Sequence, residues 1–205
     1  MAVLQPLKVT ITNYPNSEGE WLSGVWHPQN DALGARDLHF GPELYIERED
    51  FAEEPPKKFK RLSPGAMVRL RYGYIIQCDE VVKSDSGEVI ELRCTYVPES
   101  KSGRDTSGLK PKGVVHWVSA QEGVTQKVRV FGLLFNSPNP DKDNLTAELN
   151  RDSLTVHEAV VEPALVASEH ERFQFERVGY FCKDTVDQGA YNQIVTLRAT
   201  YKPPA

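Results

Sequence analysis

The sequence predicts a mainly β fold made of two related lobes. Short segments rich in β-branched and aromatic residues recur between the 14 glycines and 14 prolines that are spread along the 205-residue chain. No stretch keeps a helical period for longer than about three turns. Two short motifs also recur at nearly the same separation. Because many short strands must cover their edges, we expect closed or nearly closed sheets.

Strands are predicted wherever apolar and polar residues alternate. In chain order these segments are 7–12, 43–47, 67–71, 73–77, 89–96, 127–131 and 195–201. The sequence Ser84-Asp-Ser-Gly87 is typical of a tight turn, so the strands on either side of it are expected to form a hairpin. Residues 27–36 are expected to form a long loop, with His27 as a turn residue. Short helices are expected over 141–149 and 163–172.

Internal repetition favours a duplication. The motif Arg71-Tyr-Gly-Tyr-Ile75 recurs 106 residues later as Arg177-Val-Gly-Tyr-Phe181. The motif Leu92-Arg-Cys-Thr-Tyr96 recurs 105 residues later as Leu197-Arg-Ala-Thr-Tyr201. Chance is the alternative, because the motifs are short. Two matches at nearly one offset nevertheless favour two related lobes.

The lobes are expected at 1–112 and 113–205, and the N-terminal strand is allowed to belong to the other lobe. Residues 100–112, rich in Ser, Gly and Lys, are expected to be a flexible loop near the boundary. The length suits one large domain or two small ones, and 40% hydrophobic and 26% charged residues are ordinary for a globular protein.

The composition also excludes several classes. No apolar run approaches the roughly 18 residues that cross a bilayer, and the first residues lack the basic stretch and apolar core of a signal peptide. A cytoplasmic location without a membrane partner is therefore expected. Three scattered cysteines (Cys78, Cys94 and Cys182) are too few for a disulfide framework or a zinc site, so no metal is expected. Cys182 is expected to be a small buried hydrophobe.

The charge is unevenly distributed. The net charge of −5 argues against nucleic acid, but residues 57–71 hold six basic residues and no acid, which leaves −11 for the remainder. Such a window usually faces an anionic partner. Phe59, Tyr72 and Tyr74 lie in or beside it, and aromatic rings interleaved with cations suit single-stranded RNA. The alternative is a solvated basic face that answers upstream acids: Glu47, Asp50, Glu53 and Glu54.

No catalytic constellation is expected. His116 lies near Ser119, but no Gly-x-Ser-x-Gly elbow accompanies them and no acid partner is placed by the sequence. A core strand with a hydrogen-bonded histidine is the favoured interpretation. His-Glu-x-x-His, Gly-x-Gly-x-x-Gly and Walker motifs do not occur.

Several blocks resemble a known family. They are Pro6–Tyr14, Tyr45–Arg48, Phe59–Leu62, Val68–Arg71, Gly113–Ser119, Leu134–Pro140 and Phe173–Cys182. Together they resemble the C-terminal anticodon-binding region of bacterial-type glutaminyl-tRNA synthetases, which are class I aminoacyl-tRNA synthetases. The resemblance implies two six-stranded-type β-barrels of the ribosomal protein L25-like class, with exchanged N-terminal strands. It also implies that the anticodon loop of tRNA(Gln) is the partner, that DNA is not, and that the parent enzyme is a monomer.

The resemblance covers no catalytic half. The family's His-Ile-Gly-His motif and Lys-Met-Ser-Lys-like loop have no counterpart here, so the chain alone is expected to be an inactive, excised domain of a glutamine–tRNA ligase. ATP and Mg²⁺ are expected only for the missing catalytic domain.

The resemblance further implies roles for individual residues. Arg61 corresponds to the reader of the third anticodon base, with Lys58 and Lys60 as helpers. Arg69 and Arg71 correspond to residues at the first base, and Gln174 and Arg177 to the pair around the central uridine, with Glu176 able to pin Arg177. An arginine fork and a glutamine amide suit these base edges. Lys57 is expected to meet phosphate, and Gln29 replaces a family asparagine.

Three alternatives stay open. The first is the related region of an archaeal or eukaryotic-type glutamyl-tRNA synthetase. The second is a free-standing β-barrel adaptor for RNA or protein that docks through Trp21, Trp26 and Trp117. The third, and least favoured, is a hydrolase that uses His116 and Ser119.

Overall fold

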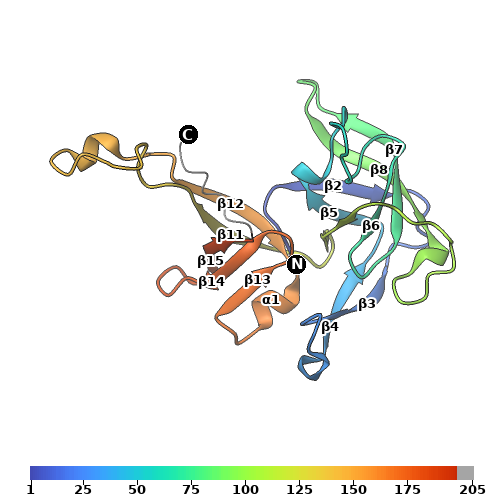
Figure 1. The fold of residues 1–205 in the computed structure, drawn as a ribbon. Helices are drawn as coiled ribbons and strands as arrows, with labels where there is room; N and C mark the ends of the chain where they lie inside the picture. Colours follow the sequence, from blue (N-terminus) through green and yellow to red (C-terminus); the bar gives the residue numbers. More distant parts are fainter. Residues whose placement is uncertain (198–205) are drawn as a thin grey trace. The chain divides into compact units, whose positions relative to one another are not determined.

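The computed structural model describes residues 1–197 and is mainly β, as predicted (Figure 1). Two curled sheets and a two-stranded ribbon hold its strands. The chain divides into two compact units, residues 1–124 with 160–168, and residues 125–159 with 169 onward. The lobe boundary after residue 112 stays a prediction. No helix among the described residues is long and apolar enough to cross a membrane.

The first sheet has seven strands in the order β10-β5-β2-β8-β7-β6-β9. β2 and β8 are parallel, whereas β8, β7 and β6 form an antiparallel meander. The bounds of its strands are β2 (Pro6–Ile11), β5 (Glu43–Glu47), β6 (Met67–Leu70), β7 (Ile75–Lys83), β8 (Val89–Val97), β9 (Val114–Val115) and β10 (Trp117–Ser119). The strands predicted at 7–12, 43–47, 67–71 and 89–96 are confirmed as β2, β5, β6 and β8, and the one predicted at 73–77 begins at Ile75 as β7. The predicted hairpin is confirmed too, and its turn ends at Gly87, with φ +83°.

The second sheet has six strands in the order β1-β12-β11-β15-β14-β13. β11 and β15 are parallel, and β15, β14 and β13 again form an antiparallel meander. The bounds are β1 (Ala2–Val3), β11 (Val124–Phe131), β12 (Leu154–Val161), β13 (Arg172–Phe175), β14 (Gly179–Lys183) and β15 (Ala190–Thr196). The order of pairings therefore repeats that of the first sheet. The order β1-β12-β11-β15-β14-β13 corresponds, strand for strand, to β10-β5-β2-β8-β7-β6.

The N-terminal strands of the two sheets are exchanged. β1 lies two residues before β2 in the chain, yet it pairs with β12 of the other sheet. β10 precedes β11 in the chain, yet it pairs with β5. The first edge strand of each sheet thus comes directly before a strand of the other sheet in the chain. This confirms the predicted exchange.

Two equivalent hairpin turns support the duplication. The β6–β7 turn places Tyr72 at φ +61°, and the β13–β14 turn places Arg177 at φ +66°. In each turn an amide donates to the carbonyl three residues earlier, Gly73 N–H to Leu70 at 2.9 Å and Val178 N–H to Phe175 at 3.0 Å. Left-handed conformations are uncommon for such side chains, so their recurrence 105 residues apart indicates a shared turn design. Residues 198–201 of the second repeated motif lie outside the described residues.

Some elements differ from the predictions. The loop expected at residues 27–36 is shorter, because residues on both sides of it pair as a two-stranded ribbon. Its strands are β3 (Glu20–Val25) and β4 (Ala35–Phe40). The expected helix at 141–149 is only a 3₁₀ turn, Leu145–Glu148, and the helix expected from Pro163 is the single short α1 (Pro163–Ala167). Pro163 suits a first helical position, but β13 follows within five residues. Cys182 is half-buried and not buried as expected, because the end of β14 is only partly covered.

The core of the first unit lies beneath β2, β5 and β8. Alternate residues of β2 are fully buried, and Phe40 and Trp117 meet edge to face with ring centroids 5.4 Å apart. Each large apolar side chain buried in this way contributes about 1.5–3 kcal/mol. This core holds in place the loops that carry the basic window.

Candidate nucleic-acid interface

A short turn before β6 presents three lysines to solvent. Phe59 N–H donates to the Pro56 carbonyl at 3.0 Å, and Lys58 adopts φ +69°. Lys57, Lys58 and Lys60 are all exposed, and no carboxylate among residues 1–197 pairs with them. Glu53, one of the upstream acids, pairs with Lys83 instead. These lysines are therefore available to phosphate groups.

Arg61 is held at a fixed orientation. Its Nε lies 3.1 Å from Oδ1 of Asp50, whose side chain is fully buried. Its Nη1 lies 3.2 Å from the Glu49 carboxylate and donates to the Glu49 carbonyl at 2.9 Å. The side chain is still 36% exposed. The alternative of a basic face paired with upstream acids is thus correct for Arg61 and not for the lysines. Arg61 presents a pre-oriented guanidinium plane.

The segment 113–115 connects the lysine turn to β6. Gly113 contacts the backbone of Lys60 and Arg61 directly. On its other side, Arg69 N–H donates to the Gly113 carbonyl at 3.0 Å, and Arg71 N–H donates to the Val115 carbonyl at 2.9 Å. The structure therefore places Arg61, Arg69 and Arg71 on neighbouring segments of the first unit, although Arg61 comes from a separate loop in the sequence.

Arg69 and Arg71 differ in their surroundings. Arg69 donates to the Ser100 carbonyl at 2.7 Å and pairs with Asp105, and its side chain is 21% exposed. Hydrogen bonds from Ser107 and from Arg69 lower the pKa of Asp105. β6 ends at Leu70, so the alternation of a strand does not extend to Arg71. The Arg71 guanidinium lies over its neighbour Tyr72 instead, 4.8 Å from the ring centroid.

Gln29 lies at the tip of the β3–β4 ribbon and is exposed. Its N–H donates to Nδ1 of His27 at 3.2 Å, and the Asn30 side chain accepts from Ala32 N–H. His27 is thus a turn residue, as predicted. The tip is held by local hydrogen bonds and leaves the Gln29 amide free to face a ligand.

Gln174 and Arg177 belong to the second unit. Gln174 is exposed on β13, directly opposite the exposed Tyr180 of β14. Phe175, one residue on, is buried and stacks on Phe181 with centroids 4.1 Å apart. Arg177 occupies the left-handed position of the turn that follows. This hairpin therefore offers an amide and an aromatic ring side by side, with an arginine at its tip.

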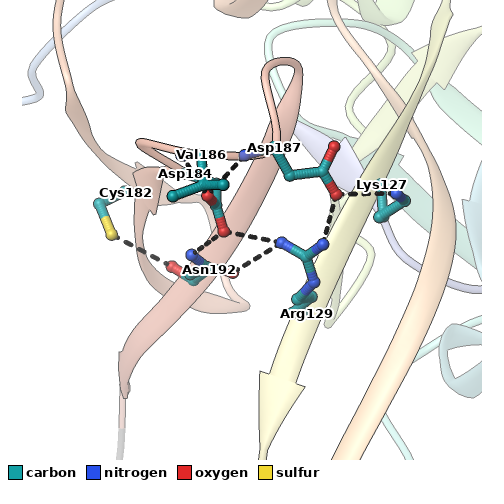
Figure 2. A network of polar contacts seen from close by, with 7 residues as sticks. All are labelled: Lys127, Arg129, Cys182, Asp184, Val186, Asp187 and Asn192. Atoms are coloured by element: carbon teal, nitrogen blue, oxygen red, sulfur yellow. Dashed lines mark hydrogen bonds and ion pairs between the residues drawn. The ribbon is translucent and has the colours of Figure 1, made fainter.

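A network of polar contacts fixes the loop after β14 (Figure 2). Asp184 accepts hydrogen bonds from two backbone amides of this loop, from Asn192 and from Arg129, all within 2.9 Å. Arg129 also pairs with Asp187, which Lys127 binds at 2.8 Å. The backbone amide of Asp187, the Asn192 amide and the remaining donors lower the pKa of Asp184 to about 2. The network ties β11, β14 and β15 together beneath an exposed loop tip.

The suggested pair of His116 and Ser119 is not a catalytic pair. His116 is buried with Nε2 3.6 Å from Glu47, whereas the buried Ser119 hydroxyl lies 2.9 Å from Nδ1 of His39. Burial opposes ionisation of Glu47, but His116 and the amides of residues 4 and 5 outweigh it and lower the pKa. The hydrolase interpretation was therefore wrong. Within residues 1–197, no three His, Cys, Asp or Glu side chains are grouped to ligate a metal.

Sequence reasoning missed one part of the surface. Arg36 and Trp26, both on the β3–β4 ribbon, stack near Tyr72 and Arg71. Arg36 and Tyr72, the most distant of these pairs in contact, are 36 residues apart in the chain. Trp26 was expected only as a docking residue of an adaptor, and no local pattern identifies Arg36 and Tyr72 as its neighbours.

Comparisons with known proteins identify the family of the chain. Two family models with one description, tRNA synthetases class I (E and Q), anti-codon binding domain, match residues 1–97 and 114–184. The glutamine–tRNA ligase of Nitrobacter hamburgensis is 50% identical over 205 residues, and the match covers 98% of this chain and 37% of the relative. The glutamine–tRNA ligase of Rhodopirellula baltica is 48% identical over 209 residues, with 98% and 35% covered.

A third relative has a similar identity and coverage. The glutamine–tRNA ligase of Vibrio vulnificus is 44% identical over 207 residues, and the match covers 98% of this chain and 37% of the relative. The chain thus spans little more than a third of the length of these relatives. The two matched models follow one another along the chain in the same order as the two sheets. The chain belongs to the family of anticodon-binding domains of class I tRNA synthetases (E and Q).

Proposed function

We propose that this domain binds the anticodon loop of tRNA(Gln) and selects it for the catalytic domain of a cytoplasmic, monomeric glutamine–tRNA ligase. In that enzyme ATP and Mg²⁺ serve the ligation reaction, which needs no residue of this chain. One observation carries the proposal above all. The Arg61 guanidinium, which buried Asp50 holds in place, lies beside three lysines. These lysines pair with no acid among the described residues.

The two kinds of cation suit two tasks. A fixed guanidinium plane can discriminate a base edge, and a good base contact is worth about 1–3 kcal/mol. Flexible lysines are point charges that bind phosphate without reading sequence. We therefore assign the third anticodon base to Arg61, with Lys58 and Lys60 beside it, and general phosphate attraction to Lys57.

The remaining bases fall to other residues. Arg71 is assigned to the first base, and Arg69 joins it through the part of its side chain that Asp105 leaves exposed. Gln174 and Arg177 are assigned to the central uridine, since an amide supplies both a donor and an acceptor. Gln29 is assigned to the loop backbone near the anticodon. Separate pockets require unstacked bases, which is how proteins read single-stranded RNA.

Titration with a fluorescent anticodon arm of tRNA(Gln) tests the proposal. We expect saturable binding that weakens steeply with salt and exceeds binding to an arm with a scrambled loop. Equal affinity for both arms at every salt concentration would refute anticodon recognition.

The same assay distinguishes recognition of tRNA(Gln) from the related recognition of tRNA(Glu). The family description covers both E and Q synthetases, whereas the curated relatives reported above are glutamine–tRNA ligases. We expect the tRNA(Gln) arm to bind more tightly than a tRNA(Glu) arm. The reverse order would assign the domain to glutamate.

A further inference from the structure

Four flat groups of the first unit follow one another in a stack. The Arg36 guanidinium carbon lies 5.0 Å from the ring centroid of Trp26 and 5.7 Å from that of Tyr72. The Arg71 guanidinium carbon lies 4.8 Å from the Tyr72 centroid. Aromatic rings and cations therefore alternate, and each contact is within the range of a cation–π interaction.

Arg36 is the rigid member of the stack. Its Nε pairs with Glu162, and its Nη1 donates to the carbonyls of Gly24 and Val25 at 3.2 and 2.7 Å. Only 8% of its side chain is exposed. Because these acceptors occupy its edge, Arg36 offers its faces to the rings and does not serve as a phosphate ligand.

The backbone holds Tyr72 against this arginine. Tyr72 has φ +61°, and the carbonyl of Arg71 accepts a hydrogen bond from Nε1 of buried Trp117 at 2.8 Å. Gly24 lets the ring come close, since a Cβ there would lie 3.2 Å from Cδ2 of Tyr72 and 2.7 Å from Cδ1 of Leu38. The site is thus built by constraints on several elements, not by one flexible side chain.

Trp26 is the open end of the stack. Its side chain is braced by Arg36, yet the residue is 42% exposed. Trp21 on the same ribbon is more exposed, at 58%. Its ring meets that of His39 in a T-shaped contact, and no cation among residues 1–197 lies over it. A ring that is already immobilised loses little entropy when a second ring stacks on it.

We infer that Trp26, supported by Arg36, Tyr72 and Arg71, is a stacking platform for one unpaired nucleobase of an RNA loop. This inference rests on the proposed function and adds a contact that does not read sequence. The partner is RNA because the stack ends at Arg71 of the basic window, and because every base has a π-face that a tryptophan can cover. Stacking is sequence-tolerant, so this platform adds affinity equally for all anticodons.

Binding by substituted chains tests the platform. We expect Trp26→Ala to weaken binding of the tRNA(Gln) anticodon arm about 5- to 150-fold, with the same factor for an arm whose anticodon is changed. Trp26→Phe should restore most of the loss, because a smaller ring still stacks. Trp21→Ala is the matched control and should change binding less than about twofold, since it lies outside the stack. Equal losses for Trp21→Ala and Trp26→Ala, or no loss for Trp26→Ala, would overturn the inference.

Tryptophan fluorescence supplies a second readout. In a Trp21→Phe background only Trp26 and buried Trp117 emit, and we expect RNA to quench Trp26. If the anticodon arm binds without quenching, the platform is wrong and the proposed function stands. If the chain shows no anticodon preference but a short single-stranded RNA quenches Trp26 at low salt, the platform stands and the proposed function fails. If neither RNA binds, both are wrong.

Discussion

Gly113 lies directly against the carbonyl oxygen of Lys60, so closely that a Cβ on residue 113 would overlap it. The glycine belongs to the segment that precedes β9, and the lysine to the turn that carries Arg61. Through this contact the second half of the chain positions a loop of the first half. The placement of Arg61 therefore depends on a residue 52 positions away in the sequence.

Gly113→Ala should displace the lysine turn. We expect a loss of about 1–3 kcal/mol in the free energy of unfolding, as for an overpacked core position, together with weaker binding of the anticodon arm. Gly132→Ala is the matched control, since the nearest atom to a Cβ on residue 132 would lie 3.6 Å away. Urea unfolding and RNA titration measure both effects. Unchanged stability and binding in Gly113→Ala would show that the contact does not position the turn.

The buried partner of Arg61 makes one substitution informative about stability. Arg61→Ala should lower the free energy of unfolding by about 1–3 kcal/mol, because the buried Asp50 loses a charged partner. The double variant Asp50→Asn with Arg61→Ala should be more stable than Arg61→Ala alone, since the buried charge is then removed. Thermal and urea unfolding of the three chains test this. A double variant less stable than the single one would contradict it.

The lysine turn should control salt dependence. We expect each of Lys57→Ala, Lys58→Ala and Lys60→Ala to flatten the slope of log K against log salt by about 0.7, the value for one phosphate contact to a single strand. Lys142→Ala, in an exposed loop of the second unit, is the control and should leave the slope unchanged. An unaltered slope in all three turn variants would show that these lysines do not meet phosphate.

Asp184 should stabilise the second unit in a pH-dependent way. Its folded pKa of about 2 lies below the ordinary value of 3.8, so its contribution is full above about pH 4 and is lost as the pH falls toward 2. We expect Asp184→Asn to be less stable than the wild type at pH 5 and the difference to shrink by pH 2. Asp85→Asn, in an exposed turn, is the control. Urea midpoints from pH 5 to pH 2 measure this, and a difference that grows on acidification would contradict it.

Local patterns predicted much of the fold because alternation along a strand reports which face is buried. β2 and β5 alternate clearly and were predicted, whereas β3 was not, since exposed Trp21 and buried Gly24 reverse the usual pattern. The exchange of β1 and β10 came from the family resemblance, because strand pairing between distant segments leaves no local signal. Likewise, residues near 105 gave no hint that Asp105 would hold Arg69, because ion pairs over 36 residues depend on the folded chain.

Recognition of the third anticodon base by Arg61 is measured most directly as a ratio of two affinities. It compares the affinity for the tRNA(Gln) anticodon arm with that for an arm changed only at the third anticodon base. We expect Arg61→Ala and Arg61→Lys to bring this ratio near one, because neither retains the guanidinium fork, while Lys57→Ala weakens both arms and leaves the ratio as in the wild type. A ratio that stays at the wild-type value in Arg61→Ala would show that Arg61 does not read this base.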